Sequence, residues 1–235
     1  MANIKEQAIG KITSGLVPDT LALKTIDFVH AQLPAWRDDL SRPDEESEKR
    51  LNLQLCKFLD SHARNDFPMV QFIHEEYQPN RRSTDISASP VEQTTIGAKL
   101  YTIYDTITVF ECKRLPTPSN KRQKEYVTGG VEDKSGGIQR FKLGLHGVDH
   151  DIVAMIGYLQ KCSVSYWHKE INKWIAELCS GIIPDTCDWN LNEILDLLEE
   201  DTSNGTAKCR SVHSRTSDNQ SNRITIYHLW IKMYK

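Results

Sequence analysis

The sequence lacks several features that would place it in a well-defined class. None of its six cysteines forms a C-x-x-C pair, which argues against a zinc ribbon or a disulfide framework and favours reduced thiols. No apolar run reaches the ~18 residues that a membrane span requires. The first residues also lack the apolar core of a secretory signal. We therefore expect a cytoplasmic protein that has no membrane association.

Nucleotide-binding glycine motifs and an excess of positive charge are missing as well. The glycine pairs at 129–130 and 136–137 belong neither to a P-loop nor to G-x-G-x-x-G, so they predict only tight turns or a close approach to a ligand. The formal net charge is −3, and it gives no support for nucleic-acid binding, although a local basic patch is still compatible with it. A chain of 235 residues with 39% hydrophobic content suits one domain with extensions.

What the sequence does contain is an apolar segment, residues 105–113, that ends in charge. Residues such as Ile107 and Phe110 predict a buried strand. Glu111 and Lys113 follow, and residues i and i+2 of a strand share a face, so the carboxylate and the ammonium should project together. Because burying unpaired charge is costly, we expect this pair to border a crevice.

A second carboxylate lies on an earlier segment with strand character. Residues 67–77 and 81–89 flank a Gln-Pro-Asn turn, which predicts an antiparallel hairpin with Asp85 in its second strand. Asp85 and Glu111 supply the oxygen ligands that Mg²⁺ prefers. A bound metal ion lowers the pKa of its water and polarises a phosphate oxygen. Lys113 would then orient that water or neutralise charge on the phosphate.

This arrangement of Asp85, Glu111 and Lys113 resembles the PD-(D/E)XK nuclease superfamily, which has the restriction-endonuclease-like fold. The proline that names the motif is absent, because Ser83 and Thr84 precede Asp85. The resemblance implies a Mg²⁺- or Mn²⁺-dependent endonuclease that hydrolyses phosphodiester bonds, with DNA favoured over RNA, in restriction or phage defence. It also implies a homodimer or a multi-protein defence complex, because cutting two strands needs two sites.

The resemblance extends to two helices. Members of the superfamily often carry a glutamate on the first core helix, and a proline followed by acids predicts such a helix over residues 44–62. Glu48 falls on its apolar face and is the first choice, and Glu45 is the second. Several members place a glutamine or tyrosine from the helix after the Glu-x-Lys strand in the active site. Gln139 occupies that position, and Arg140 beside it is a candidate phosphate ligand.

Basic residues near the proposed site are candidate contacts to a phosphate backbone. Residues 114–125 form the most basic stretch of the chain, and an arginine pair lies at the tip of the predicted hairpin. A solvated loop and a solvated hairpin tip are the alternative interpretations. The candidates are Arg81, Arg82, Arg114, Lys121, Arg122 and Arg140.

The expected fold class is α/β (α+β mixed), with a restriction-endonuclease-like central mixed β-sheet flanked by helices. Residues 1–40 should form an N-terminal helical extension packed on the core, with an apolar helical face that runs up to Pro34, and residues 41–235 should form the nuclease domain. The periodicities predict strands at 152–160, where a helix is the alternative, and helices at 135–146, 165–178 and 189–200, and a C-terminal β-hairpin of 208–215 with 223–231.

Two polar groups of residues permit more than one interpretation. The histidines and aspartates of 146–151 suggest a metal cluster, but a polar cap of the next element is favoured. His213 and Arg215 share a face of their predicted strand, where they would serve substrate binding or a structural charge cluster.

Two other functions are compatible with the sequence. One is a catalytically inactive nucleic-acid-binding, scaffold or regulatory protein on the same fold, which the acidic pI favours and the complete Asp85, Glu111 and Lys113 set disfavours. The other is an unrelated α+β regulator in which the motif is accidental. Geometry separates them, because a nuclease requires Asp85 and Glu111 to lie close enough to share one cation, within ~6 Å.

Overall fold

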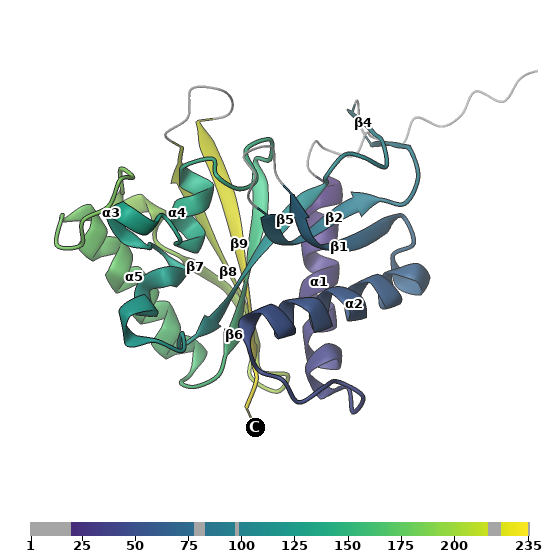
Figure 1. The fold of residues 1–235 in the computed structure, drawn as a ribbon, viewed down its shortest axis with the longest axis horizontal. Helices are drawn as coiled ribbons and strands as arrows, with labels where there is room; N and C mark the ends of the chain where they lie inside the picture. Colours follow the sequence, from purple (N-terminus) through teal and green to yellow (C-terminus); the bar gives the residue numbers. More distant parts are fainter. Residues whose placement is uncertain (1–19, 78–82, 97–98, 216–221, 235) are drawn as a thin grey trace, which may run out of the picture.

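The computed structural model describes residues 20–77, 83–96, 99–215 and 222–234, with the backbone alone at residues 120 and 121. Seven strands form one mixed sheet in the order β1-β2-β5-β6-β9-β8-β7, and helices lie on both sides of it (Figure 1). The strands of this sheet are β1 (Val70–Tyr77), β2 (Ser83–Pro90), β5 (Thr108–Leu115), β6 (Ile152–Leu159), β7 (Asp196–Asp201), β8 (Thr206–Ser214) and β9 (Arg223–Lys232). The helices are α1 (Thr20–Asp38), α2 (Glu48–Asp66), η1 (Asn120–Tyr126), α3 (Gly130–Asp133), α4 (Gly137–Lys142), α5 (Val164–Cys179) and η2 (Leu191–Glu193).

The strand directions confirm the mixed α/β class. β1, β2 and β5 form an antiparallel series, β6 and β9 then pair in parallel, and β8 and β7 close the sheet with antiparallel pairing. The predicted hairpin around residues 78–82 and the C-terminal hairpin are both present. The apolar segment 152–160 is the strand β6 and not a helix, because it is buried between two parallel neighbours.

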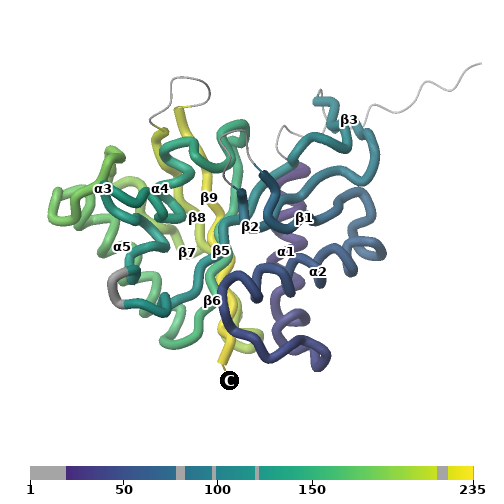
Figure 2. Tube along the Cα trace, viewed as in Figure 1, coloured from purple at the N-terminus to yellow at the C-terminus, as the bar shows by residue number. Residues whose placement is uncertain are grey.

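Two apolar cores flank the sheet, one on each face. α1 and α2 cover one face, where Leu33 and Leu55 pack with Phe110 of β5. α4 and α5 cover the other face, where Phe141 and Ile175 belong to the second core. The tube in Figure 2 shows the same three layers, with the early and the late helices on opposite sides of the strands. Trp167 and Trp174 of α5 also belong to this core.

The first described helix continues past the proline at which its apolar face was predicted to stop. Pro34 lies inside α1, which ends at Asp38. Trp36, in the last turn, is 1% exposed, and its ring lies 5.6 Å from that of Tyr158 on β6. Packing of this residue therefore stabilises a last turn that the proline alone would disfavour.

The helix predicted over residues 189–200 is wrong. The chain forms the short 3₁₀ helix η2 and then the strand β7, which pairs with β8 at the edge of the sheet. Leucines and acids there fit a helical period, but every residue of β7 is exposed. The segment has no buried helical face, and the free edge of β8 supplies hydrogen-bond partners instead. Its acidic side chains suit an edge strand, because charge there discourages further strand pairing.

Residues 90–105 and the two glycine pairs also have defined backbone conformations. Residues 90–105, whose apolar residues fit a helical and a strand period alike, carry the small hairpin of β3 (Thr94–Ile96) and β4 (Lys99–Tyr101). The glycine pairs allow the chain to cross itself, since a Cβ on Gly136 would lie 2.3 Å from Thr128 Cα. No helix in the described parts of the chain is long and apolar enough to cross a membrane. All six cysteines are described and carry free thiols.

Candidate active site

Strand β5 runs beyond its pairing with β2, which leaves part of its edge open. The last matched pair between them is Ile86 with Phe110, although β5 continues to Leu115. On the same side of that pair, β2 extends back to Ser83, where it pairs with β1. The two strands therefore diverge at Glu111, and the strand pairing along the edge of β5 has a notch that side chains fill.

Carboxylates replace the missing strand along this edge. Asp85 Oδ2 accepts a hydrogen bond from the Cys112 N–H at 2.7 Å, and Glu48 Oε2 accepts one from the Arg114 N–H at 3.0 Å. Because alternate N–H groups of a strand point to the same side, these acids continue the ladder that β2 begins. An acid on β2 and an acid at the start of α2 are thereby held next to each other along β5.

The backbone is strained directly across from Asp85. The register of β1 and β2 places Glu75 opposite Asp85 without a regular pair, and Glu75 has a φ of 54°. A positive φ is uncommon for a residue other than glycine, and such strain is concentrated at functional sites. The Glu75 carboxylate lies 3.0 Å from Lys49 Nζ. The first hairpin is therefore distorted at the level of the candidate site.

Glu111 is the buried centre of the charge cluster. Its carboxylate is 1% exposed. Oε1 lies 3.1 Å from Lys113 Nζ and 2.6 Å from Arg140 Nη1, and Oε2 lies 2.9 Å from His146 Nδ1. Both oxygens are therefore bound by groups that carry, or can carry, positive charge.

Lys113 links the central carboxylate to the edge carboxylates. Its Nζ also lies 3.5 Å from Glu48 Oε1, and the side chain is 5% exposed. Burial lowers the pKa of Lys113, but the surrounding carboxylates, Glu111 foremost, raise it above its ordinary value. The ammonium is charged at neutral pH and lies in the middle of three acids.

The two strand carboxyls have pKa values that are displaced in opposite directions. Burial and then the charge of Glu111 raise the pKa of Asp85 to about 7. Burial also acts to raise the pKa of Glu111, but the positive groups around it, Lys113 foremost, hold that pKa below its ordinary value. Perturbed carboxyl groups of this kind are concentrated at functional sites.

His146 is the site residue that the sequence did not reveal. The segment 146–151 was predicted to be a polar cap, yet the His146 ring is 2% exposed and contacts Glu111. Lone histidines carry little sequence signal, and the contact joins residues 35 positions apart. The only available clue was the unusual density of histidine and aspartate after the helix that follows Glu-x-Lys.

Among the described residues, Gln139 makes no hydrogen bond to Asp85, Glu111 or Glu48. It is fully buried, its Oε1 accepts from the Gly129 N–H at 3.0 Å, and its Nε2 donates to Asp185 Oδ1 at 2.9 Å. Gln139 therefore fixes the backbone at Gly129. The next residue of α4, Arg140, contacts Glu111 instead.

The other predicted residues are distributed unevenly around the site. Glu45 pairs with Arg50 at 3.0 Å, whereas Glu48 accepts the hydrogen bond from the Arg114 N–H, so Glu48 is the acid from this helix at the site. Arg114 lies at the end of β5, and its Nε is buried and has no hydrogen-bond partner among the described residues. Arg81 and Arg82 lie outside the described residues, as does the side chain of Lys121.

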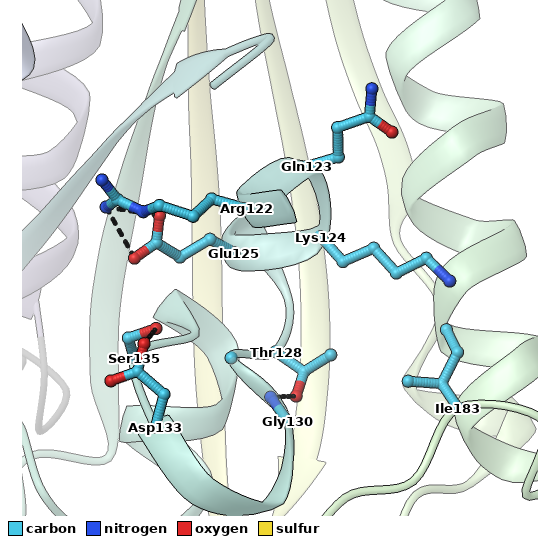
Figure 3. A pocket seen from close by; sticks show the side chains of 10 residues that line it. Arg122, Gln123, Lys124, Glu125, Thr128, Gly130, Asp133, Ser135 and Ile183 are labelled. Atoms are coloured by element: carbon cyan, nitrogen blue, oxygen red, sulfur yellow. Dashed lines mark hydrogen bonds and ion pairs between the residues drawn. The ribbon is translucent and has the colours of Figure 1, made fainter. Parts of the chain in front are cut away.

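A pocket of about 260 Å³ is lined by η1 and by residues from the segment 128–135 (Figure 3). Arg122 and Glu125 form an ion pair at its wall, and Lys124 points away toward Ile183. The hydrogen bond with Glu125 is the main cause that raises the pKa of Arg122, and the charge of Glu48 also contributes. Arg122, whose side chain is 55% exposed, therefore faces solvent and still experiences the charge of Glu48.

His213 and Arg215 have structural roles and form no part of the site. Arg215 donates to the backbone carbonyls of Gly147 and His150, at 2.7 Å in each case. His213 is fully buried, and its Nδ1 lies 3.3 Å from Glu193 Oε2. Of the two interpretations of this strand face, the structural charge cluster is therefore the one observed.

The donor set suits a hard divalent cation, although the cation positions are taken by side chains. Among the described residues, no three His, Cys, Asp or Glu side chains are grouped as a ready metal site. Asp85, Glu111 and Glu48 nevertheless supply carboxylate oxygens of the kind that Mg²⁺ prefers. Burial and then the charge of Glu111 raise the pKa of Asp85, and a nearby divalent cation would favour its ionised form. A divalent ion held by these carboxylates would have to displace one of the present partners of Glu111.

Comparison of the chain with protein-family models, with curated proteins and with solved structures found no match.

Proposed function

We propose that this protein is a metal-dependent nuclease with a restriction-endonuclease-like fold, which hydrolyses phosphodiester bonds of DNA in the cytoplasm as part of restriction or phage defence. One observation carries the proposal. Asp85 and Glu48 accept hydrogen bonds from alternate N–H groups of β5, those of Cys112 and Arg114, while Glu111 and Lys113 project from the same part of that strand. Three acids and one buried amine are thereby assembled at a notch in the sheet.

Each side chain has a role in this scheme. Asp85 and Glu111, with Glu48, would hold Mg²⁺ or Mn²⁺, which supplies an acidified water and polarises the phosphate. Lys113 stays protonated among the acids and stabilises the negative charge that develops on the phosphate. Arg114 and Arg140 lie beside the acids and bind phosphate oxygens. A homodimer or a multi-protein complex would align two such sites on the two DNA strands.

A second candidate function rests on a specific contact. Both oxygens of Glu111 are already bound by Lys113, Arg140 and His146. If this arrangement is permanent, no metal ion binds, and the protein is an inactive nucleic-acid-binding or scaffold protein on the same fold.

Cleavage of defined nucleic acids tests the proposal. Purified protein is incubated with supercoiled, linear and single-stranded DNA and with RNA, in Mg²⁺, Mn²⁺ or chelator. We expect a metal-dependent cut that leaves a 5′-phosphate. Lys113→Ala should lower the rate by about 100-fold or more, because it removes charge stabilisation of the transition state.

A matched variant separates loss of chemistry from loss of structure. Lys173→Ala removes a lysine that is 60% exposed and paired with Glu177 on α5, so its cleavage rate should equal that of the wild type. Circular dichroism checks that Lys113→Ala is folded. Cleavage that is unchanged by Lys113→Ala, or binding of DNA with no cleavage in any metal, would contradict a nuclease centred on this site.

A further inference from the structure

We infer that Arg140 occupies the cation position on Glu111 in the metal-free protein and leaves it for a phosphate of the bound nucleic acid, so that metal ion and nucleic acid bind cooperatively. The inference rests on the proposed function and adds a regulatory contact to that site. Arg140 would keep the acids neutralised in the absence of substrate and release them when substrate arrives.

The contact geometry makes Arg140 and a metal ion mutually exclusive. Arg140 Nη1 lies 2.6 Å from Glu111 Oε1, and Lys113 Nζ lies 3.1 Å from the same oxygen. A Mg²⁺ ion binds a carboxylate oxygen at ~2.1 Å and brings its own water shell. One oxygen cannot accept a guanidinium, an ammonium and a hydrated divalent ion together, because the like charges would be in contact.

Exposure decides which partner of Glu111 leaves. The side chains of Lys113 and His146 are 5% and 2% exposed, so neither can move to water without leaving a buried polar group unpaired. Arg140 is 23% exposed and lies on α4 at the border of the notch. It is the one partner of Glu111 that can turn toward solvent while the carboxylate keeps its other contacts.

The hydrogen bonding of Arg140 shows that it has unused capacity. A guanidinium has five N–H donors. Among the described residues, Arg140 makes one side-chain hydrogen bond, to Glu111, and its Nε is buried without a partner. A phosphate offers a bidentate acceptor that would use two donors at once. Nucleic acid therefore provides Arg140 with a better partner than the carboxylate oxygen that it shares with Lys113.

Metal affinity measured without any cleavage tests the inference. Titration calorimetry with Mn²⁺ is performed on the full chain without nucleic acid, for the wild type, Arg140→Gln, Arg140→Lys and Arg64→Gln. We expect Arg140→Gln to bind Mn²⁺ about 10-fold or more tightly than the wild type, since it removes a charge-assisted hydrogen bond that the ion must displace. Arg140→Lys, which keeps the charge, should lie between them.

Arg64→Gln is the matched control. Arg64 also binds a carboxylate, Asp60 Oδ2 at 2.9 Å, but it is 77% exposed and lies at the far end of α2. Its Mn²⁺ affinity should equal that of the wild type. A second series adds a DNA oligonucleotide with cleavage-resistant phosphorothioate linkages, which should tighten Mn²⁺ binding by the wild type about 10-fold and that of Arg140→Gln much less, because coupling is reciprocal and passes through Arg140.

The outcomes separate this inference from the function on which it rests. Equal Mn²⁺ affinities for the wild type and Arg140→Gln, or a DNA effect of the same size in both, overturn the role of Arg140 and leave the nuclease proposal standing. Absence of Mn²⁺ binding in every protein, with or without DNA, overturns the proposed function and this inference with it. The DNA effect on the wild type needs no variant, so the test does not depend on how a substitution folds.

Discussion

At the scale of single residues, the site is a set of charges whose balance is incomplete. The positive groups around Glu111 outweigh the effect of its burial, so the pKa of Glu111 lies below its ordinary value. For Asp85, one backbone N–H and the charge of Lys113 do not offset its burial and the charge of Glu111, so its pKa is raised to about 7. A carboxyl group that is this costly to ionise lowers the stability of the metal-free protein. Such a cost is expected where function rather than stability determines the residue.

Asp85→Asn should therefore stabilise the metal-free protein while it abolishes cleavage. The pKa of Asp85 in the folded protein lies above its ordinary value of 3.8. Ionised Asp85 therefore lowers the free energy of unfolding progressively as the pH rises from 3.8 toward 7. We expect a gain of about 1–3 kcal/mol in the free energy of unfolding at pH 7, which shrinks to nothing near pH 4. Urea unfolding in chelator at both pH values measures it.

Asp188→Asn is the control for this prediction. Asp188 is exposed, and a substitution there should change the stability by less than ~0.5 kcal/mol. Loss of stability in Asp85→Asn at pH 7 would show that the hydrogen bond to Cys112 outweighs the cost of ionisation. It would contradict the statement that ionised Asp85 destabilises the metal-free protein.

At the scale of elements, the divergence of β2 from β5 creates the site, and the packing of helices holds it. α2 must lie where its first residue, Glu48, reaches the N–H of Arg114. α1 packs in the same core as α2 and the sheet, and it contacts β6, β8 and β9. Although it precedes the segment predicted as the nuclease domain, α1 shares that domain's core.

Ile26→Ala tests how much the fold depends on α1. Ile26 is fully buried in the core beneath the sheet, so the substitution leaves a cavity and should lower the free energy of unfolding by about 2–5 kcal/mol. Lys24→Ala, at an exposed position two residues earlier, should leave it within ~0.5 kcal/mol. A small effect of Ile26→Ala, measured by chemical denaturation, would mean that α1 is dispensable for the fold.

At the scale of the whole molecule, a buried polar network joins the sheet to the helices on its second face. It runs through Lys142, Glu193, His213, Ser211, His228 and Tyr126. Ser211 Oγ lies 2.7 Å from His213 and 2.8 Å from His228. Ser211 is 2% exposed, so this serine, histidine and glutamate offer no nucleophile to a substrate. The network fixes α4 to β8 and β9, and α4 carries Arg140.

This network predicts loss of stability in mild acid. His228 is fully buried, and burial, followed by the charges of His213 and His168, lowers its pKa well below 6.5. The unfolded chain takes up a proton below pH ~6.5 and the folded chain does not, so stability is full above that pH and falls below it. The expected slope is about 1.4 kcal/mol per pH unit for this histidine.

Urea unfolding of the wild type and His228→Gln at pH 7.5, 6.5 and 5.5 measures this slope. Asp85 changes stability in the opposite direction over the same pH range in both proteins. The quantity to follow is therefore the free energy of unfolding of the wild type minus that of His228→Gln. This difference should become smaller as the pH falls, because the variant lacks the histidine that the folded wild type must keep neutral. A constant difference would contradict this role of His228.

The sequence by itself determined what local periodicity controls. Alternating apolar residues specified β5 and placed Glu111 and Lys113 on one face, and the turn after Tyr77 specified the hairpin that carries Asp85. The apolar face of α2 selected Glu48, because the position of a side chain on a helix follows from its residue number alone.

Only the tertiary structure decided the contacts that join distant segments. The leucine-rich acidic segment after Trp189 forms β7 because the edge of β8 offers unpaired N–H and C=O groups. Pairing with them favours a strand over a helix that would have no buried face. The divergence of β2 from β5 brought Asp85 and Glu48 to the same strand edge. The positions of Arg140 and His146 on Glu111 depend on how α4 packs against the sheet, and no local pattern records the charge and burial that one residue experiences from another 29 or 35 positions away.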